Sequence, residues 1–148
     1  MCNKEGSMFE LDKRLASDTV VVGNFPLSVV LMSRDSRYPW CILVPRIANI
    51  TESYQLTAEQ QHQLCLESAM VAETLMGEFN GDSMNVAALG NVVSQLHVHH
   101  VVRFISDETW PGPIWGVGQA VPYSDEALMT MKLKIAAVLA TQQDFIAD

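Results

Sequence analysis

The chain has 148 residues, of which 49% are hydrophobic and 18% are charged, a composition that fits one globular domain and excludes a disordered chain. Nine Lys and Arg residues against 17 Asp and Glu residues give a net charge of −8. This charge argues against nucleic acid or an anionic membrane as a partner, because both require a basic patch. It does not exclude a small phosphorylated ligand, which needs only local hydrogen-bond donors.

We expect neither a secretory signal nor a membrane span. No run reaches the roughly 18 apolar residues of a membrane span, and residues 1–6 lack the apolar core of a signal peptide. The cysteines Cys2, Cys41 and Cys65 are odd in number and form no CxxC pair, so we expect neither a disulfide framework nor a cysteine zinc site. We therefore expect a cytoplasmic protein in which Cys41 and Cys65 are buried apolar residues.

The first half of the chain predicts three strands and a helix. Apolar and β-branched runs predict strands over 19–22, 27–32 and 40–44, the last two forming an antiparallel hairpin around a polar turn. Thr57 and Gln60 form a capping box ahead of apolar residues at helical spacing, which predicts one helix over 58–79. Asn80-Gly81-Asp82 ends this helix, and Gly81 is able to take the left-handed conformation.

The second half predicts strands over 83–89 and 95–105 and a final helix over 125–145 that Ser124 caps. The intervening Trp110-Pro111-Gly112-Pro113 excludes regular structure. Together these elements predict an α+β fold: an antiparallel five-stranded sheet with the long helix packed on one face and a C-terminal helix. We expect a single domain over residues 1–148.

Three of the four histidines lie within His97–His100, in the predicted strand over 95–105. Strand side chains alternate between two faces. The apolar face, which we expect to meet the core, carries Leu96, Val98, His100, Val102 and Phe104. The polar face carries Gln95, His97, His99, Val101 and Arg103.

Imidazole titrates near neutral pH and serves as a nucleophile, a general base or a metal ligand, so the polar face is the candidate site. Arg103 either steers an anionic substrate or is a surface charge near the strand end. We expect His100 in the core and His62, in the first turn of the long helix, in solvent.

This segment resembles the histidine triad (HIT) superfamily of nucleotide hydrolases and transferases. The family pattern is His-φ-His-φ-His and two apolar residues, after a loop of the form Asn-x-Gly…Gly-Gln-[Ser/Thr]. Here Asn85 and Gly90-Asn91 lead to Gln95-Leu96-His97-Val98-His99, and the stretch ending in Trp115 is especially similar to a bacterial branch of HIT family hydrolases. The resemblance covers about residues 9–115, which leaves a helical extension over about 124–146, and it implies a HIT-like fold and a homodimer.

The resemblance also implies catalytic roles. His97 corresponds to the nucleophile that becomes nucleotidylated, and His99 to the histidine that organises the α-phosphate and the nucleophile. Gln95 stands in the place of the first histidine, where an amide keeps hydrogen-bonding capacity but holds no charge. A second register would make His97, His99 and His100 the triad, but strand alternation turns His100 to the other face.

Binding roles follow from the same resemblance. Asn85 and Asn91 correspond to phosphate-contacting amides, whereas Val92 replaces a Ser or Thr donor. Either Ser33 or Asp35 corresponds to a ribose-binding position, depending on the register. Trp110 and Trp115 either cap the core or line the nucleotide site.

The implied function is hydrolysis or nucleotidyl transfer at the α-phosphorus of a nucleoside phosphate derivative, through a nucleotidyl-His97 intermediate and with no metal or other cofactor required. Two alternatives stay open. The departures at Gln95 and Val92 are compatible with a nucleotide-binding module that does not catalyse. A His-x-His strand also binds zinc when a third ligand, such as His62 or an Asp, completes the set.

Overall fold

The computed structural model describes residues 7–148, so Cys2 and the expectation for residues 1–6 lie outside it. Its elements in chain order are α1 (Lys13–Asp18), β1 (Thr19–Asn24), β2 (Ser28–Ser33), β3 (Trp40–Pro45), the 3-10 turn η1 (Ser53–Gln55), α2 (Ala58–Phe79), β4 (Ser83–Ala87), β5 (Val98–Arg103), α3 (Asp125–Leu139) and β6 (Ile146–Ala147). The described strands form one antiparallel sheet in the order β4-β5-β3-β2-β1-β6. The predicted α+β fold is confirmed, with a sixth strand that the sequence did not predict.

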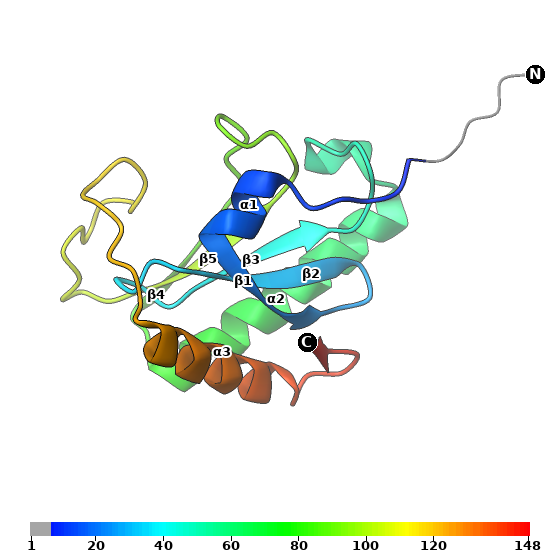
Figure 1. Ribbon diagram of the computed structural model, residues 1–148. Coiled ribbons are helices and arrows are strands. Elements are labelled where there is room, and N and C mark those ends of the chain that lie inside the picture. The colour runs from blue at the N-terminus through cyan, green and yellow to red at the C-terminus, as the bar shows by residue number, and fades with distance from the viewer. Residues whose placement is uncertain (1–6) are drawn as a thin grey trace, which may run out of the picture.

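Different parts of the chain cover the two faces of the sheet (Figure 1). On one face, side chains of α2 and α3 pack with the strands, among them Leu64, Val71, Leu75, Ile135 and Leu139. On the other face, α1 supplies Leu15, which packs against Val29, Leu31, Ile42 and Val44 of β2 and β3. Because β2 and β3 are buried on both faces, they appear in the sequence as continuous apolar runs.

The long helix α2 has the bounds that the sequence predicted. Its capping box is formed: the Gln60 amide donates to the Thr57 hydroxyl at 3.2 Å, and the Thr57 amide donates to the Gln60 side chain at 2.9 Å. At the other end, the left-handed conformation is taken by Asn80, with φ 51°, and not by Gly81. Gly81 has a different reason to be small, because a Cβ there would meet the side chains of Val102 and Met76.

The C-terminal region differs from the prediction. The last helix ends at Leu139 instead of continuing to Phe145. Phe145 packs on Phe25 with 5.2 Å between ring centroids, and the next two residues pair with Gly23 and Asn24 as β6. Gly23 has no side chain where the Ile146 carbonyl and the Phe145 ring approach, so the edge strand can close against β1.

Two single-residue expectations have opposite outcomes. Cys41 is buried as expected, whereas Cys65 is exposed on α2, so that expectation is wrong.

Within residues 7–148, no helix has both the length and the apolar composition that crossing a membrane requires. The expected single-domain organisation stays a prediction.

Candidate functional site

His97 and His99 line a cavity of about 670 Å³ on the sheet face that carries α1. The walls come from α1, the turn between β2 and β3, the loop before β5 and the loop over 114–122. Of the residues predicted for the site, the cavity also contacts Ser33, Asp35, Asn91 and Trp115. A cavity of this size, largely apolar with a few polar groups, fits a small-molecule ligand.

The hydrogen bond of His97 defines which ring nitrogen carries its proton. Nδ1 lies 2.7 Å from the backbone carbonyl oxygen of Gln95. Because a carbonyl oxygen only accepts, Nδ1 carries the hydrogen and the neutral ring keeps its lone pair on Nε2. Among the described residues Nε2 has no hydrogen-bond partner, so His97 presents an unengaged lone pair at the cavity wall.

His99 has the opposite arrangement. The indole Nε1 of Trp40 donates to Nδ1 of His99 at 3.0 Å. Since indole nitrogen only donates, Nδ1 of His99 is the acceptor and the proton of the neutral ring lies on Nε2. Burial, with smaller contributions from His97 and His100, lowers the pKa of His99 to about 3. His99 is therefore a neutral N–H donor at physiological pH, with its ring centroid 4.9 Å from that of His97.

His100 lies on the other side of the strand, as alternation predicts. It is fully buried, with Nε2 2.7 Å from the Ser68 hydroxyl on α2 and Nδ1 3.1 Å from the carbonyl of Val98. Burial lowers its pKa to about 4. His62 is exposed, also as expected. Only two of the clustered histidines reach the cavity, so the second register for the triad is wrong.

The three amides predicted for the site separate in space. Asn91 lines the cavity, whereas Asn85 and Gln95 lie outside it. The oxygen of Asn85 accepts from Arg103 Nη1 at 2.8 Å. Gln95 precedes the start of β5, and its side chain binds the backbone of the N-terminal segment: it accepts from the Asp12 amide and donates to the Glu10 carbonyl, each at 2.9 Å.

Arg103 is not a surface charge. It is 1% exposed, so the surface alternative is wrong, and no part of its guanidinium is free to steer a substrate. Nε and Nη2 donate to the Asp107 carboxylate at 2.8 and 2.9 Å, and Nη2 also donates to the Thr109 hydroxyl at 2.9 Å. This pairing lowers the pKa of Asp107 to about 2. The strand thus uses Arg103 to fasten the loop that follows it.

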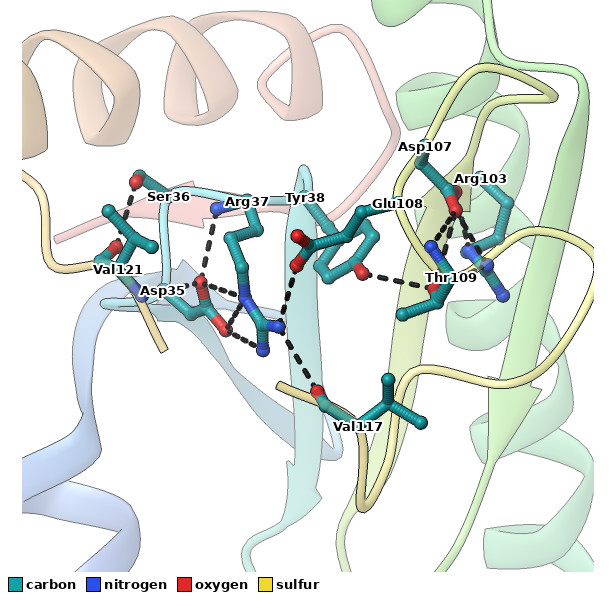
Figure 2. A network of polar contacts seen from close by, with 10 residues as sticks. All are labelled: Asp35, Ser36, Arg37, Tyr38, Arg103, Asp107, Glu108, Thr109, Val117 and Val121. Carbon is teal, nitrogen blue, oxygen red and sulfur yellow. Dashed lines mark hydrogen bonds and ion pairs between the residues drawn. The ribbon is translucent and has the colours of Figure 1, made fainter. Parts of the chain in front are cut away.

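Arg37 makes a second anchor for the same loop (Figure 2). Its guanidinium pairs with Asp35 at 2.8 Å, and Nη1 donates to Glu108 at 2.9 Å and to the Val117 carbonyl at 3.2 Å. The two arginines, one from the β2–β3 turn and one from β5, hold residues 107–117 against the sheet. Trp115 consequently packs on His99, with 5.3 Å between the ring centroids. Trp110 instead stacks with Arg103, whose Cζ lies 5.8 Å from the centroid of the Trp110 ring.

Ser33 and Asp35, the predicted ribose-binding alternatives, both line the cavity. Burial alone would raise the pKa of Asp35, but hydrogen bonds from Arg37 and Val121 outweigh it, and the pKa is lowered. The Ser33 hydroxyl accepts from the Asp35 amide at 3.2 Å. Both side chains already have protein partners, and which of them contacts a ribose stays a prediction.

The sequence did not predict the hydrogen bonds of Trp40 and Glu67. Trp40 looked like the first residue of a buried strand, and its bond to His99 depends on the pairing of β3 with β5. Glu67 on α2 is fully buried, and its carboxylate accepts from the amides of Leu27 and Ser28 at 3.1 and 2.8 Å.

Among residues 7–148, no three side chains of His, Cys, Asp or Glu gather closely enough to hold a metal ion.

Comparison with known proteins gives the family. The HIT domain model matches residues 14–105. A histidine triad protein from Marinobacter aquaeolei VT8 is 48% identical, with 91% of this chain and 98% of that chain covered and a TM-score of 0.88. Histidine triad proteins from Bradyrhizobium japonicum and Sinorhizobium meliloti 1021 are 38% and 40% identical, cover 90% and 87% of this chain and 99% and 96% of their own, and have TM-scores of 0.86 and 0.84. No curated protein matched. The chain belongs to the HIT domain family.

Proposed function

We propose that the protein hydrolyses or transfers the nucleotidyl group of a nucleoside phosphate derivative, such as a dinucleoside polyphosphate or a nucleoside phosphoramidate. The observation that carries this proposal is the fixed tautomer of His97. Its Nδ1–H is held by the Gln95 carbonyl, which leaves the Nε2 lone pair at the cavity wall. A lone pair so oriented is what an imidazole nucleophile requires.

The proposed reaction has two displacements. Nε2 of His97 forms a bond to the α-phosphorus while the bond from phosphorus to the leaving group breaks, and the leaving group takes up a proton from solvent. Water then displaces Nε2 from the nucleotidyl-His97 intermediate, its oxygen remains on phosphorus, and the surplus proton returns to solvent. The scheme requires no metal ion, because hydrogen-bond donors take over the stabilisation of the phosphoryl oxygens.

Neutral donors near His97 support this scheme in an acidic protein. His99 offers Nε2–H beside the nucleophile, and Asn91 offers a side-chain amide on the cavity wall. The backbone N–H groups of Asn91 and Val92 also donate to no other described residue, so they are free for a ligand. Asn85 accepts from Arg103 outside the cavity, so it supplies no donor there.

The test is covalent trapping. The wild-type protein is mixed with an adenosine phosphoramidate or a diadenosine polyphosphate, quenched, and analysed by intact mass and peptide mapping. We expect a nucleotidyl adduct on His97, release of the mononucleotide, and loss of both in His97→Ala. His62→Ala is the matched control, because it removes an exposed histidine on α2 and should react like the wild type.

A nucleotide-binding module without turnover is the second candidate, and the position of Gln95 outside the cavity favours it. Tight binding of a mononucleotide with no adduct and no product, across the phosphoramidates, polyphosphates and nucleotidyl sulfates, would contradict the catalytic proposal. Family membership further supports a homodimer, which light scattering after gel filtration would test. The free cysteines Cys41 and Cys65 support a cytoplasmic location, which fractionation of cells would test.

A further inference from the structure

The pairing of β3 with β5 places Trp40 diagonally across from His99. The register sets Trp40 opposite Val101 and Ile42 opposite His99. Diagonal neighbours on one face of an antiparallel pair lie about 7–8 Å apart, a gap that aromatic and other long side chains can span. The indole of Trp40 spans it and places Nε1 3.0 Å from Nδ1 of His99, with 5.5 Å between ring centroids.

The two site histidines therefore meet opposite kinds of partner. A carbonyl oxygen, which only accepts, holds Nδ1 of His97, whereas an indole N–H, which only donates, holds Nδ1 of His99. The first partner leaves a lone pair on Nε2, and the second leaves a hydrogen on Nε2. Two neighbouring imidazoles thus become a nucleophile and a donor.

We propose that Trp40 is a positioning residue for the reaction, which fixes His99 in the Nε2–H tautomer and so makes it a hydrogen-bond donor to the phosphoryl group. The catalytic part of this statement rests on the proposed function, whereas the tautomer does not. Without the indole N–H, Nδ1 of His99 is free to carry the proton, and a fraction of the molecules then offers a lone pair to the phosphoryl oxygen. Protonation of His99 would also place two N–H groups against each other, so Trp40 disfavours the cation.

Trp115 provides the matched comparison within the same aromatic cluster. Its ring packs edge-on against Trp40 and against His99, at 6.4 and 5.3 Å between centroids. Its Nε1, however, is buried without a hydrogen-bond partner among the described residues. Replacing Trp115 by Phe removes a similar volume and an indole N–H but leaves the Trp40–His99 bond in place.

The experiment is long-range ¹H–¹⁵N NMR of the histidine side chains in the wild type, Trp40→Phe and Trp115→Phe. We expect His99 to be the Nε2–H tautomer in the wild type and in Trp115→Phe, and a mixture with the Nδ1–H tautomer in Trp40→Phe. His97 should stay Nδ1–H in all three proteins, which also reports that the site is folded. The wild-type spectrum alone can overturn the proposal, namely if it shows His99 as the Nδ1–H tautomer.

Turnover separates this proposal from the proposed function. If nucleotidyl-His97 forms, kcat of Trp40→Phe should fall in proportion to the fraction of His99 found as the Nδ1–H tautomer, about twofold for an even mixture, because only the Nε2–H form donates to the phosphoryl group. Unchanged kcat with a shifted tautomer would overturn the catalytic role of Trp40. Absence of any adduct in the wild type would instead refute the proposed function. In that case, the NMR comparison of the wild type with Trp40→Phe would still show whether Trp40 fixes the tautomer of His99.

Discussion

Replacing Asp107 by Asn should destabilise the protein strongly, because it leaves a buried guanidinium without its counter-charge. Arg103 is 1% exposed, and two of its nitrogens donate to the Asp107 carboxylate at 2.8 and 2.9 Å. Its remaining partners, Asn85 and Thr109, are neutral. Breaking a buried ion pair by removing one partner costs about 3–5 kcal/mol, a large share of the roughly 5–15 kcal/mol that stabilises a typical domain.

Urea unfolding of Asp107→Asn and the wild type at pH 7 measures this loss. Asp18→Asn is the control, because the Arg14–Asp18 pair is exposed and 3.8 Å long, and its removal should cost no more than about 0.5 kcal/mol. The pKa of Asp107 is about 2 in the folded chain against 3.8 ordinarily, so the pair stabilises the fold above pH 3.8 and its contribution disappears as the pH falls through 2. A loss below 1 kcal/mol in Asp107→Asn would refute the reasoning.

Two further predictions concern His100 and Gln95. Because the pKa of His100 is about 4 in the folded chain and about 6.5 ordinarily, the unfolded chain binds the proton first, and about 3 kcal/mol of unfolding free energy should be lost as the pH falls from 6.5 through 4. His99, whose pKa is lowered to about 3, loses stability over the same pH range, so His100→Gln should roughly halve the slope of this part of the pH profile in chemical denaturation. An unchanged slope would contradict the prediction. Gln95→Ala removes both bonds to the backbone of Glu10 and Asp12 and should speed amide hydrogen exchange in that segment by about 5- to 30-fold, the equivalent of about 1–2 kcal/mol. A fall in kcat with unchanged exchange would mean that Gln95 acts on substrate instead.

Local patterns of sequence were sufficient for the main elements and for the faces on which the histidines lie. The capping box and helical spacing gave the bounds of α2, and the alternation of side chains separated His97 and His99 from His100. These features depend on residues close together in the chain, where helix and strand periods determine which side chains share a face.

Long-range packing decided what the local patterns left open. The two-residue strand β6 exists because Phe145 packs on Phe25 and Gly23 leaves room for it, and neither contact has a periodic signal in the sequence. The sequence shows that Gln95 and Arg103 alternate with the histidines, but their roles depend on which groups the fold brings to them: the N-terminal backbone for Gln95 and Asp107 for Arg103.

The sequence by itself determined that this is a HIT-like α+β chain with His97 and His99 on one polar face. Only the tertiary structure decided the proton on each ring, because a tautomer is set by the partner of the other nitrogen. That partner is a local carbonyl for His97 but a residue 59 positions away for His99. Strand pairing alone brings Trp40 there.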